Sequence, residues 1–140
     1  LRYLKNIDLK ELGLIFKNLK IELVNLQYGD VNDEINDFVK KTNIVIHKIK
    51  HDIKKDLDAL TSLIDLCDLV ISTDSVTVRL SGAINKESWL LIPNVSTFFY
   101  QLNISNCLWS PCVKLYRQDK RADWTNILNN MRQDLIKRYN

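Results

Sequence analysis

The chain has 140 residues, of which 46% are hydrophobic and 26% are charged, with a formal net charge of +3. These values are typical of one globular domain and exclude a disordered or fibrous protein. The 20 basic and 17 acidic residues nearly balance, so we expect no nucleic-acid partner. No apolar run approaches the ~20 residues of a membrane-spanning helix. The start, Leu1–Lys5, has neither an initiating Met nor a signal peptide, so we expect a fragment of a longer protein.

Helical and strand patterns alternate along the chain. In order, we expect a helix over 7–19, a strand over 20–27, a helix over 32–41, a strand over 43–48 and a helix from Asp56 or Asp58 to Leu66. Next come a strand over 68–72, a helix over 76–84, a strand over 88–92, a long loop over 94–111, a strand over 113–117 and a helix over 124–139. This order predicts an α/β fold: a single 1–140 domain with a parallel sheet covered on both faces by right-handed crossovers.

Cysteine and histidine usage bears on compartment and metal binding. Three cysteines, an odd number, favour a reducing cytoplasm. Cys67 ends an apolar helix face and is expected in the core. The sequence leaves open whether Cys107 and Cys112 form a disulfide. The only histidines are His47 and His51, and the sequence has no Cys-x-x-Cys motif, so we expect no metal site.

The most informative segment is the turn between the strand 68–72 and the helix 76–84. Thr73, Asp74 and Ser75 occupy this turn, where a parallel strand ends and a helix begins. Open α/β sheets bind phosphorylated ligands at such places, outside the carboxyl ends of the strands. We therefore expect an anion-binding site here.

The first turn of this helix supplies the groups that an anion needs. If Ser75 is the N-cap, the N–H groups of Val76, Thr77 and Val78 point out of the helix toward a diphosphate. Arg79 lies four residues after Ser75, on the same face, and a guanidinium pairs bidentately with phosphate. Arginine cannot act as a general base, because it does not deprotonate in proteins. The alternative is that Ser75 only caps the helix and Arg79 is a solvated charge.

Other residues near strand ends complete the candidate site. Asp74 can cap the helix, orient Arg79 or contact a sugar hydroxyl. Gln27, Tyr28 and Asn94 each follow a parallel strand and are expected to line a cleft at the same edge.

Two features of the sequence have packing alternatives. The aromatic run Phe98, Phe99 and Tyr100 is either a stacking wall for a base or sugar, with Tyr100 lining the cleft, or a hydrophobic plug for the long loop. Gly82 is expected to permit close helix–strand packing.

Residues 68–84 resemble a known signature. They read Asp-Leu-Val-Ile-Ser-Thr-Asp-Ser-Val-Thr-Val-Arg-Leu-Ser-Gly-Ala-Ile. This is similar to the signature of family 9 (heptosyltransferase-like) glycosyltransferases, and most similar to the glycosyltransferase-like domain that follows tetratricopeptide repeats in many bacterial proteins. Further landmarks occur in the same order: Leu-Gln-Tyr-Gly-Asp at 26–30, Asp-Leu-Asp-Ala-Leu at 56–60, Ser-Trp-Leu-Leu-Ile-Pro at 88–93, Phe-Phe-Tyr at 98–100, the segment 106–118 and Asp-Trp at 123–124.

The resemblance implies a fold and a function. The fold would be Rossmann-like, the C-terminal, donor-binding half of a GT-B glycosyltransferase, which needs no metal ion or other cofactor. Such an enzyme transfers a sugar from a nucleoside diphosphate to an acceptor, here unknown. The partners would be the nucleotide-sugar donor, the N-terminal half and tetratricopeptide repeats of the same protein. The first strand of the half would precede Leu1, and the edge exposed by its loss would invite pairing with a second copy.

The chain departs from the family pattern at two marked positions. Arg79 stands where the family has His, and Ser110 where it has Tyr. Diphosphate binding survives the first change, but proton transfer by that residue does not, so any general base would lie outside this chain. The alternative function is therefore a degenerate, non-catalytic glycosyltransferase-like module that serves interaction or structure.

Overall fold

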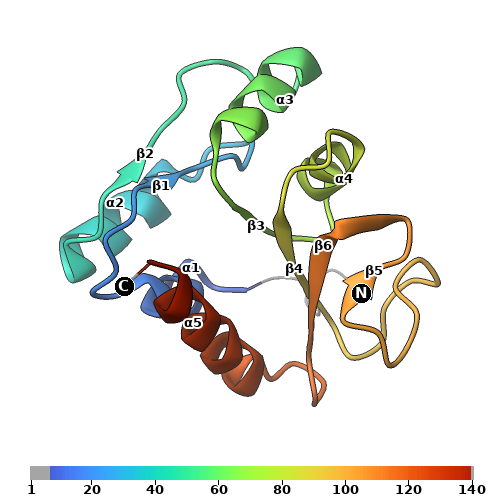
Figure 1. Ribbon diagram of the computed structural model, residues 1–140. Coiled ribbons are helices and arrows are strands. Elements are labelled where there is room, and N and C mark those ends of the chain that lie inside the picture. The colour runs from blue at the N-terminus through green and yellow to red at the C-terminus, as the bar shows by residue number, and fades with distance from the viewer. Residues whose placement is uncertain (1–6, 140) are drawn as a thin grey trace.

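The computed structural model describes residues 7–139, so the expectation drawn from Leu1–Lys5 lies outside the described residues. The helical elements are α1 (Leu9–Gly13), the 3-10 helix η2 (Leu14–Phe16), α2 (Asn32–Thr42), α3 (Leu57–Leu66), α4 (Val76–Ala83) and α5 (Thr125–Tyr139). The strands are β1 (Leu23–Val24), β2 (Ile46–His47), β3 (Val70–Thr73), β4 (Ser88–Ile92), β5 (Asn106–Cys107) and β6 (Ser110–Arg117). Figure 1 shows these elements as an α/β arrangement, which confirms the predicted fold class.

The larger sheet has the strand order β3-β4-β6-β5, and we call it the main sheet. Its strands β3, β4 and β6 are parallel, as the sequence predicted, with Val70 opposite Ser88 and Ser88 opposite Val113. The antiparallel strand β5 was not predicted, because it lies within the expected loop 94–111. It pairs with an early extension of β6, so that β6 begins at Ser110 rather than at residue 113.

The second sheet contains only β1 and β2, paired in parallel with Leu23 opposite Ile46, and we call it the small sheet. The expectation of one continuous sheet is wrong at this point. The apolar runs 20–27 and 43–48 form only two paired residues each. A strand extends only as far as it has a hydrogen-bonding neighbour, and within residues 7–139 these two strands pair only with each other.

The first helix is shorter than the predicted 7–19. Asp8 caps it as expected, since its carboxylate accepts the N–H of Lys10 at 2.8 Å. The helix tightens into η2 and ends at Lys17, and Asn18 then adopts a left-handed backbone with a φ of 64°. The other predicted helices and the strands β3 and β4 agree with the structure within two residues at each end.

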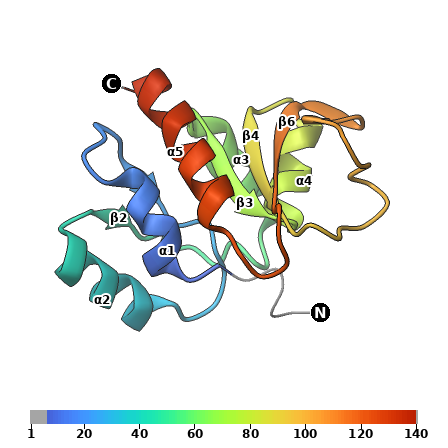
Figure 2. The same cartoon turned by 90° about the horizontal axis from the view of Figure 1, so that it is seen from below.

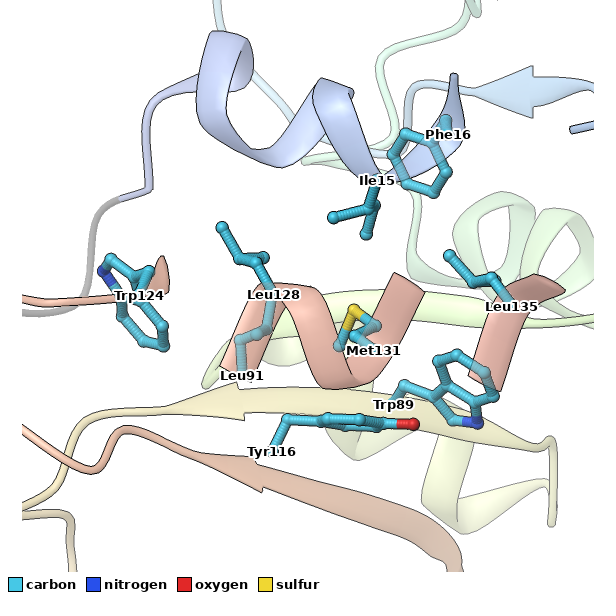
Figure 3. Close-up of a cluster of buried hydrophobic side chains, with 9 residues drawn as sticks. All are labelled: Ile15, Phe16, Trp89, Leu91, Tyr116, Trp124, Leu128, Met131 and Leu135. Carbon is cyan, nitrogen blue, oxygen red and sulfur yellow. The ribbon is translucent and has the colours of Figure 1, made fainter. Parts of the chain in front are cut away.

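Helices cover both faces of the main sheet, as predicted. Along β4, Trp89 and Leu91 join the core formed with α5 and η2, whereas Leu90 and Ile92 join the core formed with α4. This alternation follows from the two-residue period of a strand. Figure 3 shows the first of these cores, in which side chains of α5 and η2 meet those of β4 and β6. Figure 2, seen from below, shows α1, α2 and α5 on the near side, with α3 and α4 behind the strands.

Gly82 allows α4 to approach the main sheet closely. A β-carbon at this position would lie 2.5 Å from the Ser110 hydroxyl oxygen of β6, too close for an undisturbed contact. The packing interpretation of Gly82 is thus supported. The cysteines Cys67, Cys107 and Cys112 are all free thiols, so the Cys107–Cys112 disulfide does not form.

Among the described helices, none combines the length and the apolar character that crossing a bilayer requires.

Candidate functional site

The candidate site lies at the carboxyl edge of the main sheet, where β3, β4 and β6 end. The loop that follows β4 returns to this edge. The Tyr100 hydroxyl donates to the Asp74 carboxylate at 2.9 Å, directly after β3. The Arg117 guanidinium, at the end of β6, donates to the Tyr100 carbonyl oxygen at 2.7 Å. The three strand ends are therefore joined by one hydrogen-bonded network.

Ser75 is the N-cap of α4, as predicted. Its backbone is extended, with φ of −145° and ψ of 172°, and its side chain makes no capping hydrogen bond. The Ser75 hydroxyl lies 2.9 Å from the Ser72 hydroxyl instead. The first N–H groups of a helix have no intrahelical acceptor, so Val76 and Thr77 keep donors aimed out of α4. The start of α4 thus presents N–H donors at the positive end of the helix dipole.

Asp74 orients Arg79, one of the three roles that the sequence left open. The Arg79 Nη2 atom lies 3.1 Å from the Asp74 Oδ1 atom. The Asp74 side chain is 9% exposed and the Arg79 side chain 51%, so the guanidinium is held on one side and open to solvent on the other. It also lies 5.1 Å from the centre of the Phe99 ring, a cation–π contact. Arg79 therefore contacts both Asp74 and Phe99, while half of its side chain stays exposed.

The three residues of the aromatic run lie in different environments. Tyr100 is buried in the core under α4 and acts as the plug. Burial raises the pKa of its hydroxyl well above the usual value, and the hydrogen bond to Asp74 adds to this, so Tyr100 stays a neutral donor. Phe98 stacks on Phe99 with ring centres 4.3 Å apart, yet Phe98 is 80% exposed.

Arg117 and Gln118 were not predicted as site residues. The Arg117 guanidinium binds the Ser96 hydroxyl at 2.8 Å and the Gln101 carbonyl at 2.8 Å, besides Tyr100, and so anchors the 94–101 loop. Burial lowers its pKa. Gln118 is 2% exposed, and neither Nε2 nor Oε1 of its side-chain amide has a hydrogen-bond partner within residues 7–139. The sequence feature that could have indicated both residues is the Arg-Gln pair at the end of segment 106–118, which resembles the end of the corresponding segment in the similar family.

Gln27 and Tyr28 lie apart from the turn at 73–75. They line a cleft of about 220 Å³ at the carboxyl edge of the small sheet. The residues around this cleft are mostly polar: Asn25, Gln27, Tyr28, Gly29, Val31, Asn32, Lys48, Ile49, His51, Asp52 and Ile53. None of the residues 73–79 contributes to it. Asn94 remains at the main-sheet edge, where its side chain accepts the N–H of Val95.

The two histidines have separate acidic neighbours. His51 Nε2 lies 2.8 Å from Asp56 Oδ2, and His47 Nε2 lies 3.4 Å from Glu22. Asp56 also caps α3 by accepting the N–H of Ala59, and this bond, with that of His51, holds the Asp56 pKa below its usual value. No group of three or more potential metal ligands occurs among residues 7–139.

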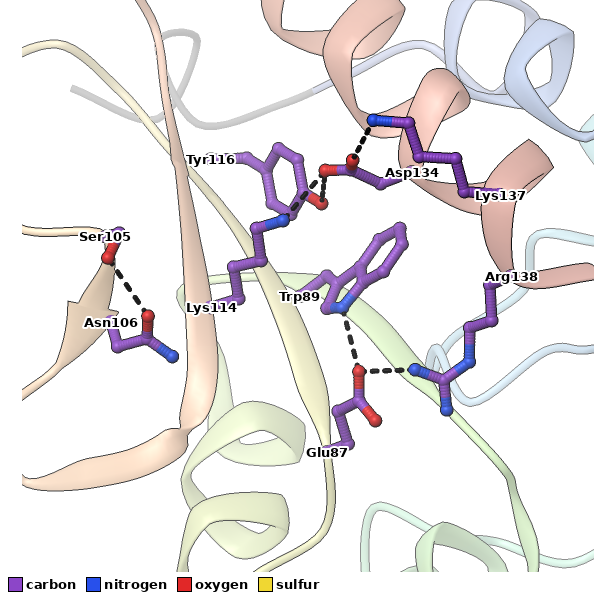
Figure 4. Close-up of polar contacts among 9 residues, drawn as sticks. All are labelled: Glu87, Trp89, Ser105, Asn106, Lys114, Tyr116, Asp134, Lys137 and Arg138. Atoms are coloured by element: carbon purple, nitrogen blue, oxygen red, sulfur yellow. Dashed lines mark hydrogen bonds and ion pairs between the residues drawn. The ribbon is translucent and has the colours of Figure 1, made fainter.

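A second polar cluster joins α5 to the main sheet, on the face opposite to the one that α4 covers (Figure 4). Asp134 of α5 accepts from Lys114 and from the Tyr116 hydroxyl, both at 2.8 Å. The Lys114 ammonium is the main cause that lowers the Asp134 pKa. Glu87 similarly joins Arg138 to the indole N–H of Trp89. These contacts stabilise the α5 packing and do not extend to Ser75 or Arg79.

Comparisons with known proteins give one limited similarity. No family model matches the chain, and no solved structure matches it. The protein FlbA of Caulobacter vibrioides is 30% identical over 105 residues, which are 74% of this chain. The match takes up 17% of the length of FlbA, so the chain resembles one part of a much longer protein.

Proposed function

We propose that the carboxyl edge of the main sheet binds the diphosphate of a nucleotide sugar, as the donor-binding domain of a bacterial GT-B glycosyltransferase. The observation that carries this proposal is the start of α4. Its first turn holds the N–H groups without intrahelical acceptors and the hydroxyls of Ser75 and Thr77, and Asp74, directly before it, pairs with the half-exposed Arg79 guanidinium. A diphosphate would bridge the helix N-terminus and the guanidinium.

The neighbouring groups support a ligand larger than phosphate. The buried Gln118 amide follows β6, two strands from the end of β3, which corresponds to about 10 Å at the usual strand spacing. A buried amide without partners costs about 1–3 kcal/mol, so a polar ligand or water at this edge would relieve that cost. The exposed Phe98 ring offers a surface for stacking a base or sugar.

In such an enzyme this domain would position the donor and stabilise the charge on the departing diphosphate. The residues that would hold the diphosphate are Ser75, Val76, Thr77 and Arg79. Asp74 would act indirectly, by orienting Arg79. No metal ion takes part in the proposal, and the acceptor and its general base would belong to the other half of the protein.

Calorimetric titration with UDP, GDP and ADP tests the proposal. We expect saturable binding of one nucleotide and at least tenfold weaker binding by Arg79→Ala. Arg121→Ala, which removes an exposed arginine outside the candidate site, is the matched control and should bind as the parent does. Gln118→Leu keeps the volume and removes the amide, and should weaken nucleoside diphosphate binding more than binding of inorganic pyrophosphate.

The degenerate module is the second candidate, favoured by the Asp74 carboxylate at the site. Asp74 is mostly buried and already pairs with Arg79, and like charges would repel a diphosphate there. No heat with any nucleotide, from a sample with a folded circular-dichroism spectrum, would support this candidate and exclude donor binding by the chain.

A further inference from the structure

The connection between β4 and β6 carries an exposed apolar surface at one edge of the molecule. Five of its large hydrophobic side chains are between 59% and 81% exposed, and we call them the loop patch: Val95, Phe98, Leu102, Leu108 and Trp109. Figure 1 and Figure 2 both show this connection on the side of the main sheet away from the small sheet. A large apolar patch on the surface of a protein usually marks a binding surface.

Contacts within the protein hold the loop patch in place. Phe98 stacks on Phe99, and the Phe99 ring meets the Trp109 ring edge-on, with ring centres 6.5 Å apart. Phe99 also packs against the core under α4. The hydrogen bonds of Arg117 anchor the 94–101 segment from the end of β6. Because these side chains are already positioned, a partner can bind them at a small cost in conformational entropy.

The loop patch is electrically neutral. Residues 93–113 contain no Asp, Glu, Lys, Arg or His. The Arg79 guanidinium lies 5.1 Å from the centre of the Phe99 ring, but its charge is paired with Asp74. A strongly charged partner, or an anionic membrane surface, therefore gains little electrostatic attraction here. In a two-fold interface each patch faces a copy of itself, and a neutral patch makes that contact without repulsion between like charges.

The area of the loop patch matches what one side of a protein dimer needs. A standard interface covers about 800 Å² on each partner and is somewhat more than half apolar, so each side supplies about 500 Å² of apolar surface. The exposed parts of the five side chains supply roughly the same area, about 500 Å². Tryptophan and phenylalanine are also enriched in protein interfaces, where charged side chains are depleted at the centre.

We propose that the loop patch is the interface of a homodimer, in which two copies of this chain pair about a two-fold axis. Phe98 and Trp109 of each copy pack against the loop patch of the other. The interface lies at the β5 side of the main sheet, whereas β3 is the strand at the opposite edge. The proposal does not depend on nucleotide binding. Phe98 is also the ring offered to a base under the proposed function, so the test omits nucleotides.

Sedimentation equilibrium of the 140-residue chain, over roughly 1–500 µM protein, tests the proposal. The parent chain should form dimers that dissociate on dilution. Trp109→Ser should weaken dimerisation at least tenfold, because it removes the largest ring of the loop patch. The matched control is Leu66→Ser, which removes an apolar side chain that is 82% exposed at the end of α3, outside the loop patch. It should dimerise as the parent does.

The fluorescence of Trp109 shows whether the loop patch is the surface that pairs. Trp89 and Trp124 are buried, so a change in solvent exposure on dimerisation reports on Trp109. Its emission should shift to shorter wavelengths, and acrylamide should quench it less, as dimers form.

Three outcomes would overturn the proposal. The first is a parent chain that stays monomeric throughout the concentration range. The second is a dimer in which acrylamide still quenches Trp109 as in the monomer, since another surface would then pair. The third is a monomeric chain whose Trp109 emission shifts only when vesicles of phosphatidylcholine and phosphatidylglycerol are added, which would assign the loop patch to a lipid surface.

Discussion

The main sheet and the small sheet are built from similar apolar runs but differ in how far those runs are used. In the main sheet, β4 has a neighbour on each side and all five of its residues are buried. In the small sheet, the runs 20–27 and 43–48 give two paired residues each, and Val45 remains 62% exposed. Local sequence sets the tendency to form a strand, whereas the number of neighbours sets its length and burial.

The largest expected effect tests this difference with the same substitution in each sheet. Leu91→Ala removes a side chain of β4 that is 1% exposed and should lower the free energy of unfolding by about 2–5 kcal/mol. Leu23→Ala acts on a partly buried position of β1 and should cost roughly half as much or less. Urea unfolding of both variants gives the comparison. Equal losses would show that the small sheet is as tightly packed as the main sheet.

Elements set by local signals were predictable from the sequence. Asp56 caps α3 and Ser75 precedes α4, as their sequence positions suggested, and the spacing of Ser75 and Arg79 placed both near the same helix turn. The separation into two sheets was not predictable, because it depends on a neighbour that no local pattern reveals. The contact between Asp74 and Tyr100 was missed for the same reason, since 26 residues separate them.

A second prediction concerns the helices on the small-sheet side. A β-carbon at Gly13 would overlap the ring of Phe38, which is 2% exposed and has little room to move. Gly13→Ala should therefore destabilise the protein by about 1–3 kcal/mol. Hydrogen exchange should accelerate in α2 more than in β4, if the two regions open separately. Adding Phe38→Leu should recover part of the loss, and a uniform acceleration across both regions would show that they unfold as one unit.

The smallest expected effect is the pH dependence that Asp134 gives to the main-sheet side. Its pKa is lowered in the folded state, chiefly by Lys114. The associated stability is fully present above the unfolded-state pKa of about 3.9 and is lost as the pH falls through the lower, folded-state value. Asp134→Asn should lower stability at pH 7 by about 1 kcal/mol or less, since the carboxylate is partly exposed, and should flatten the acid limb of the stability curve. Urea unfolding between pH 2 and 7 measures this, with Asp68→Asn, at an exposed position before β3, as the control. An unchanged acid limb in Asp134→Asn would show that the Lys114 and Tyr116 contacts do not couple α5 to the sheet, and the tighter packing of the main sheet would then rest on its apolar core alone.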